Sequence, residues 1–276
     1  MAANCPPTAS IMSRQKQSEL LGTAIGVLLI GTLIQCAGAL KHERLVFPDA
    51  LTILRAFFRL LGQGQTWRMM GTTLAHLAET LLIAAAVGVP LGLLEGLSRF
   101  ARSVLRPLVS FIRAIPMIVL IIMVMVLADY RDVPVAASAL MLIPLISEAT
   151  AGGCRSIPQE LIDVYRMNAN LNLMVLFRVY LPLMAGYLRQ AFLEAVGTGM
   201  KLVITAEYMV QTRNSMGKAV FSSSYFNEYQ DIYAYAILMV LMILLLSEAP
   251  AALWIVLKKR KRRFTEPAYK AYTGSN

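Results

Sequence analysis

Ionisable residues inside one long apolar segment are the side chains of this sequence most able to do chemistry. Residues 183–210 are mostly apolar, but they include four such residues: Arg189, Glu194, Lys201 and Glu207. A charge at membrane depth is costly, so these groups usually face a bundle interior or a water-filled cavity. Lys201, the most central, either lines a pathway and attracts an anion or pairs with an acid on another helix, such as Glu148 or Asp129. Glu207 either gates that pathway or caps a loop.

Patterns for enzymatic or metal chemistry are missing from the sequence. The two histidines, His42 and His76, are too few and too scattered for a typical zinc or haem pocket. The three cysteines have unrelated spacings and form neither a disulfide framework nor a CxxC metal site. A Walker A loop, a GxGxxG motif and a Ser/His/Asp set are also absent. We therefore expect a chain that is not an enzyme and binds no cofactor itself.

The composition indicates a membrane protein. Of 276 residues, 57% are hydrophobic and 15% are charged, whereas soluble domains have about 45–50% apolar and about 25% charged residues. The net charge of +10 does not indicate nucleic-acid binding, because the basic residues flank apolar runs instead of forming a solvated face.

Six apolar runs are long enough to cross a bilayer, which takes about 20 residues of helix. They cover residues 20–40, 72–97, 104–128, 134–152, 183–210 and 232–257. The fold class is therefore all-α, a polytopic membrane bundle. The Lys and Arg residues near the span ends favour both termini on the cytoplasmic side, although the loop after the first span is also basic. The basic tail from Lys258 to Arg263 is suited to anionic lipid headgroups.

The segment from Ala50 to Leu61 forms a separate amphipathic helix. Leu51, Leu54 and Phe58 recur at helical spacing, while Arg55 and Arg59 fall on another face. This helix either lies at the membrane interface or packs on the bundle as a short additional segment.

A polar interval, residues 154–182, separates the fourth and fifth spans and predicts two short cytoplasmic helices. Ser156 with Gln159 forms a capping box for the first helix, and Asn170 caps the second. Three apolar residues of the second helix are predicted to be exposed and to mark a partner site: Leu173, Leu176 and Phe177.

This interval resembles the EAA loop of the membrane subunits of bacterial ABC importers, the binding-protein-dependent (MetI-like) permeases. Asp163-Val164-Tyr165 stands for the Glu-Ala-Ala of that loop, Ala169 for its Gly and Leu181-Pro182 for its closing Leu-Pro. Three further stretches are similar to the nitrate/sulfonate/taurine branch of the family: Gly88–Leu93, Phe111–Pro116 and Ala206-Glu207.

The resemblance implies a permease subunit that works with several partners. These are two cytosolic ATPases that hold the ATP and Mg²⁺, an extracytoplasmic solute-binding protein, and a second copy of the chain or a related permease. The resemblance also implies how the chain is divided. A cytoplasmic segment (1–19) and a first span (20–40) precede a periplasmic loop with the amphipathic helix (41–66). A permease core (67–257), which contains the EAA loop at 154–182, and a basic cytoplasmic tail (258–276) follow. The implied location is the bacterial inner membrane.

Two groups of residues follow from this expectation. The ATPase-docking set is Asp163, Arg166, Ala169, Asn170, Leu173, Leu176, Phe177 and Arg178. The substrate-pathway set is Lys201, Glu194, Glu207 and Pro116.

The expected cargo is a small anionic or zwitterionic solute of the sulfonate, taurine, nitrate or bicarbonate type. A thiamine precursor or another small organic solute is the alternative within the same class. An ion-coupled secondary transporter and a structural membrane scaffold are the alternatives from other classes.

Prolines and glycines carry the remaining predictions. Pro90, Pro116 and Pro144 are expected to bend their helices, and Gly88 with Gly92 is expected to allow close helix packing. Glu95 and Glu148, near the cytoplasmic ends of their spans, are expected to pair with neighbouring arginines.

Overall fold

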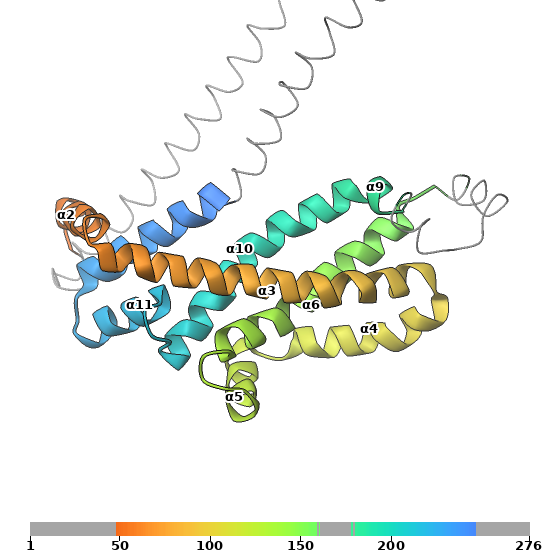
Figure 1. The fold of residues 1–276 in the computed structure, drawn as a ribbon, viewed down its shortest axis with the longest axis horizontal. Coiled ribbons are helices and arrows are strands. Elements are labelled where there is room, and N and C mark those ends of the chain that lie inside the picture. The colour runs from red at the N-terminus through yellow and green to blue at the C-terminus, as the bar shows by residue number, and fades with distance from the viewer. Residues whose placement is uncertain (1–47, 159, 161–177, 179, 247–276) are drawn as a thin grey trace, which may run out of the picture.

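The structure is a computed structural model that describes residues 48–158, 160, 178 and 180–246. Within these residues every regular element is helical (Figure 1). The labelled helices are α2 (Ala50–Leu61), α3 (Gly64–Leu97), α4 (Arg99–Ala114), α5 (Met117–Leu127), α6 (Val133–Arg155), α9 (Leu181–Leu183), α10 (Ala185–Val210) and α11 (Met216–Tyr225). The helix Tyr229–Leu246 follows α11. The first predicted span, most of the EAA loop and the basic tail lie outside the described residues.

Helices α3 and α6 form the centre of the bundle because small residues let their backbones approach closely. A Cβ on Gly92 would lie 2.3 Å from the carbonyl oxygen of Ser147, and one on Gly96 would lie 2.5 Å from the Cβ of Cys154. Gly88 is also tight, with the Ile143 carbonyl oxygen at 3.0 Å. The predicted close packing at Gly88 and Gly92 is confirmed, and Gly96 extends it by one more turn.

Three helices of the described part are long and apolar enough to cross a membrane: α3, α6 and Tyr229–Leu246. They correspond to the second, fourth and sixth predicted spans. The fifth predicted span forms one helix, α10, whose 26 residues include the ionisable groups singled out from the sequence. Its inner face packs on α3 and α6 through small or apolar residues such as Ala195, Met200 and Val203.

The third predicted span, residues 104–128, consists of two helices that are long and apolar enough to cross a membrane only when taken together as one broken span. The chain breaks between α4 and α5, whose axes are bent by 99°. Pro116 has no N–H for a helical hydrogen bond and disfavours helical backbone at Ile115, which is extended at φ −70° and ψ 126°. The predicted bend at Pro116 is therefore a complete break, whereas α3 runs on through Pro90 and α6 through Pro144.

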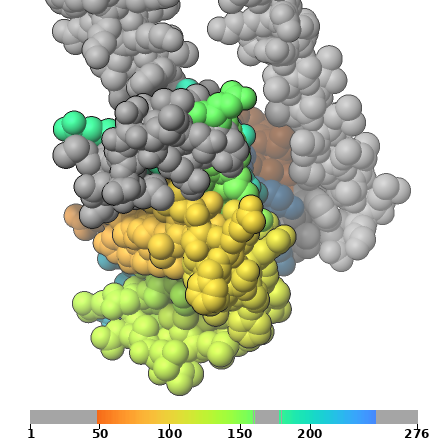
Figure 2. All heavy atoms as spheres, turned by 90° about the vertical axis from the view of Figure 1, so that its right-hand side faces the viewer, coloured from red at the N-terminus to blue at the C-terminus, as the bar shows by residue number. Residues whose placement is uncertain are grey.

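Helix α4 has one apolar face and one basic face. Phe100, Val104, Leu108 and Phe111 are exposed, while the arginines between them lie over α3 and α6. Figure 2 shows α4 in yellow and α5 in yellow-green at the surface of the molecule. This inside-out arrangement suits a helix whose outer neighbours are lipid or another protein chain rather than water.

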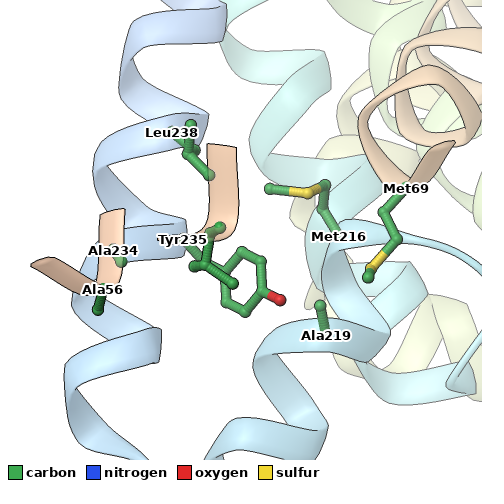
Figure 3. Packing of buried hydrophobic residues seen from close by; sticks show 8 residues of the cluster. Ala56, Met69, Met216, Ala219, Ala234, Tyr235 and Leu238 are labelled. Atoms are coloured by element: carbon green, nitrogen blue, oxygen red, sulfur yellow. The ribbon is translucent and has the colours of Figure 1, made fainter. Parts of the chain in front are cut away.

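Helix α2 has the bounds that the sequence predicts, and one face of it packs on the bundle. Ala56 and Leu60 are buried in a cluster with Ala234, Tyr235 and Met216, among others (Figure 3). Arg59 of α2 also forms a salt bridge with Asp231. The opposite face leaves Leu51, Leu54 and Phe58 exposed, so one face contacts the bundle and the other is free to contact the membrane interface.

Candidate functional site

Most of the predicted docking set lies outside the described residues. This holds for Asp163, Arg166, Ala169, Asn170, Leu173, Leu176 and Phe177. Arg178 is described and exposed. Pro116 is also exposed and stands as the N-cap residue of α5.

Two of the three pathway candidates of α10, Glu194 and Lys201, lie on a single exposed face. Gln190, Glu194, Lys201 and Thr205 are all exposed, and with Gly197 between them they recur every three or four residues, which places them along one side of a helix. A Cβ on Gly197 would meet nothing within 4 Å. This face, which we call the polar stripe of α10, is opposite the face packed on α3 and α6.

Lys201 has no carboxylate partner within the part of the chain that the structure describes. Glu148, one of its two suggested partners, instead binds Arg113 of α4. The interpretation of a Lys201–Glu148 pair is therefore wrong. The expectation that Glu148 and Glu95 pair with arginines is confirmed, since Glu95 lies 3.9 Å from Arg155.

Glu207 is buried at the far end of α10, with no exposed surface. Its Oε2 accepts hydrogen bonds from the Thr73 hydroxyl (2.9 Å) and the Gly217 backbone N–H (3.1 Å). Its Oε1 lies 2.8 Å from Nδ1 of His76, and because an ionised carboxylate can only accept, that nitrogen is the donor. A buried charge needs such partners, and Glu207 has three from two other helices.

The N-terminus of α11 completes this arrangement. Of its first four N–H groups, Met216 donates to the Thr73 hydroxyl, Gly217 to Glu207, Lys218 to the hydroxyl of Ser215 and Ala219 to the Ser215 carbonyl. The partial positive charge of a helix N-terminus also favours a carboxylate there. Of the two interpretations left open for Glu207, the geometry supports the cap, because the carboxylate holds α11 against α3.

Glycine is required where α11 meets α10. A Cβ on Gly217 would lie 2.5 Å from both the Glu207 Cβ and the Tyr208 nitrogen, and 2.7 Å from the Ile204 carbonyl oxygen. The α11 backbone therefore contacts the α10 backbone directly, which places its N–H groups at the carboxylate.

A cavity of about 720 Å³ opens beside Glu207. It is bounded by the start of α3, the loop before α6 and the loop after α10. Its lining includes Thr72, His76, Arg131, Thr212, Arg213 and Lys218. We call it the basic pocket, because none of its lining residues is acidic.

A second polar cavity, of about 340 Å³, lies at the other end of α3. Its lining includes Glu95, Arg102, Arg106, Arg113, Glu148 and Arg155, and we call it the arginine cavity. His76 and Glu95 are 19 residues apart on α3, which at about 1.5 Å per residue separates the two cavities by about 28 Å along the helix. The hydrocarbon core of a bilayer is about 30 Å thick.

Comparison with known proteins assigns this architecture. Residues 88–263 match the family described as "Binding-protein-dependent transport system inner membrane component". The chain belongs to this family of ABC importer permeases. The match takes in the α3–α6 contact, the arginine cavity and the polar stripe of α10.

Relatives and solved structures agree with the assignment. The permease is 28% identical over 231 residues to the bicarbonate transport system permease protein CmpB of Synechococcus elongatus, covering 79% of this chain and 82% of that one. It is 26% identical to the glycine betaine/proline betaine permease protein ProW of Escherichia coli, over 53% of this chain and 42% of that one. Its fold resembles the inward-facing MetNI methionine ABC transporter, with a TM-score of 0.60 and 18% identity over 70% of this chain and 97% of that one. It also resembles a bacterial ABC transporter that imports alginate, with a TM-score of 0.61 and 13% identity over 93% of this chain and 100% of that one.

Sequence reasoning missed the basic pocket of the permease. From the sequence alone, the three cations Arg131, Arg213 and Lys218 are seen only as charges near the ends of predicted spans. His76 is seen only as a histidine without a metal-binding partner. The one local signal is that all three cations lie in or just after short polar loops that follow apolar runs. Their convergence depends on how α3, α6, α10 and α11 pack, which spacing along the chain does not contain.

Proposed function

We propose that this permease forms half of the translocation pathway of an ABC importer for a small anionic or zwitterionic solute. The cargo is of the sulfonate, taurine, nitrate or bicarbonate type. The observation that carries the proposal is the polar stripe of α10, which is exposed in the single chain although it belongs to a predicted span.

A polar helix face inside a bilayer needs a partner other than lipid. Glu194 and Lys201 each cost several kcal/mol if they face hydrocarbon, about 2.5–3.5 kcal/mol on the translocon scale for Lys and Asp. The stripe therefore faces either a second permease subunit or water. A pathway between two copies supplies both, and it makes Lys201 a cation that attracts an anionic cargo.

The relatives support this choice of cargo. CmpB is named for bicarbonate, an anion, and ProW for glycine betaine and proline betaine, which are zwitterions with a carboxylate. A lysine on the pathway favours this shared negative group through a charge-assisted hydrogen bond.

Transport is driven from the cytoplasm through the EAA loop. In this proposal Leu173, Leu176 and Phe177 seat in a groove of an ATPase subunit, and Asp163 and Arg166 maintain the register. Closure of two ATPases around MgATP then moves two permease subunits as rigid bodies and switches the access of the pathway. A binding protein delivers the solute at the basic-pocket end, and both termini lie in the cytoplasm.

The pathway role is tested by Lys201→Ala in the permease–ATPase complex reconstituted in proteoliposomes with its binding protein. We expect uptake of radiolabelled taurine, nitrate or bicarbonate to fall about tenfold, the loss that corresponds to one charge-assisted hydrogen bond of about 1.4 kcal/mol. Lys201→Arg, which retains the charge, is the matched control and should keep most of the uptake. Unchanged uptake in Lys201→Ala, with complex assembly intact, would remove Lys201 from the pathway.

The coupling role is tested by Phe177→Asp, with Phe177→Leu as the apolar control. A buried unpaired carboxylate in the docking groove should separate ATP hydrolysis from uptake, so that the ATPase no longer responds to the loaded binding protein. Normal coupling in the aspartate variant would contradict the docking assignment. Uptake driven by an ion gradient with no ATP would favour a secondary transporter instead.

A further inference from the structure

We propose that the basic pocket is an entry site that binds one small oxyanion, a carboxylate, sulfonate, nitrate or bicarbonate group, before it reaches the polar stripe of α10. This inference rests on the proposed function and extends it to a second, separate set of residues. Neither the family match nor the names of the relatives assign a site here.

The cations of the basic pocket form no salt bridge among the described residues. Arg131, Arg213 and Lys218 approach it from three different segments, and among the described residues none of them has a carboxylate within salt-bridge distance. Three unpaired cations around one cavity create a local field that attracts an anion. A guanidinium presents donors in the planar fork that suits an oxyanion.

A buried hydroxyl in the same cavity also lacks a partner. Thr212 is only 6% exposed, and its Oγ1 is buried with no hydrogen bond among the described atoms. An unsatisfied buried hydroxyl costs about 1–3 kcal/mol, so it calls for an explanation. Because Thr212 belongs to the pocket lining, in this proposal a small rotation of its side chain lets a bound oxyanion supply the missing acceptor.

Two residues of the loop after α10 have left-handed backbone. Gln211 and Asn214 both take left-handed conformations, at φ 56° and 54°, and they bracket Thr212 and Arg213. Gln211 ends α10, and its N–H bonds back to the Glu207 carbonyl. The turn therefore depends on the same helix end that carries the buried carboxylate.

The carboxylate beneath the cavity leaves an excess of positive charge, because the single Glu207 is opposed by the three cations of the pocket lining. Glu207 already accepts three hydrogen bonds, and its partner His76 also belongs to the pocket lining. Arg213 and Lys218 also line a neighbouring hollow that contains Glu228 and Asp231, and among the described residues Glu228 forms no salt bridge with either cation. The Asp231 carboxylate is occupied by Arg59.

The test uses the permease–ATPase complex in nanodiscs of phosphatidylcholine, without its binding protein. Equilibrium binding of radiolabelled bicarbonate, taurine and sulfate is measured for the wild type and for the triple variant R131Q/R213Q/K218Q. We expect saturable binding in the wild type and at least tenfold weaker binding in the triple variant. Thr212→Val, which is nearly isosteric and removes no charge, should weaken binding several-fold. Because this change is small, its effect on binding can be read even if the triple variant folds poorly.

Three results would overturn the inference. The first is that the wild type shows no saturable binding at millimolar anion. The second is that the triple variant binds the anion as well as the wild type does. The third is that the triple variant keeps its anion binding and loses only the stimulation of the ATPase by the binding protein. The last result would make the cations a contact for the binding protein. The proposed function fails separately, if the wild-type complex transports none of these anions or if Lys201→Ala leaves uptake unchanged.

Discussion

At the scale of single residues, Glu207 shows how one buried charge joins three helices. It lies on α10, its side-chain donors come from α3, and its backbone donor comes from the first turn of α11. Removing one partner of such a group is costly because the rest stay buried and unsatisfied.

The close contact at Gly217 predicts that a methyl group there destabilises the permease. Gly217→Ala places a Cβ on backbone atoms that cannot move aside, and overpacking of this kind costs about 1–3 kcal/mol. Thermal unfolding in detergent should show a clearly lower Tm. Gly71→Ala in α3, where a Cβ meets nothing within 4 Å, is the control and should leave the Tm unchanged or raise it.

A double-mutant cycle tests the carboxylate itself. Glu207→Gln and His76→Ala should each lower stability, but the double variant should lose less than the sum, because the two side chains share one hydrogen bond. The coupling is expected to be about 0.5–3 kcal/mol. Strictly additive losses would mean that the 2.8 Å contact contributes nothing to stability.

At the scale of elements, the bundle depends on close contact between α3 and α6 and on the break between α4 and α5. The glycines of α3 allow the close contact with α6, and Pro116 causes the break between α4 and α5. Because α4 turns back after Ser98, its arginines lie over the end of α6, where Arg113 reaches Glu148.

The α3–α6 contact predicts a position-specific effect of small side chains. Gly92→Ala directs a Cβ to 2.3 Å from a carbonyl oxygen of α6, so the two helices must separate and every contact along them weakens. We expect a lower Tm and less monodisperse protein in size-exclusion chromatography. Gly152→Ala lies on α6 itself but meets nothing within 4 Å, so it should behave as the wild type does.

The sequence predicted elements well where the pattern is local. The bounds of α2 follow from its helical spacing, Gly88 and Gly92 from their separation, and the bend at Pro116 from its missing N–H. It did not predict the partners of Glu207, because Thr73 and His76 lie more than 130 residues away along the chain. The same limit explains Lys201, for which spacing could propose Glu148 as a partner but could not show that Arg113 of α4 takes it.

At the scale of the whole molecule, two polar cavities lie at opposite ends of the bundle, with apolar helix surface between them. The exposed apolar faces of α4 and α5 and the polar stripe of α10 cannot all contact lipid. In the proposed importer, a second subunit packed against the stripe resolves this conflict, because the polar stripe of that subunit supplies polar partners.

The orientation of the molecule is tested by a matched pair of serine-to-cysteine variants in a background with Cys5, Cys36 and Cys154 replaced. Ser224 of α11 and Ser103 of α4 are both exposed and lie at the two ends. We expect Ser224→Cys to react with a membrane-impermeant maleimide added to intact cells, and Ser103→Cys to react only after the cells are opened. The reverse pattern would invert the assigned topology.

The distance of about 28 Å between His76 and Glu95 along α3 sets a hydrophobic span that the surrounding lipid must match. Acyl chains that give a hydrocarbon core of about 30 Å leave both polar ends in the headgroup region. In lipids with much shorter chains the apolar helix surface would be left in contact with headgroups, and in much longer ones the buried carboxylate region and the arginines would be drawn into the tails. Mismatch of either sign is relieved by tilting or by local deformation of the bilayer, so acyl-chain length should tune transport by this permease with no change in its sequence.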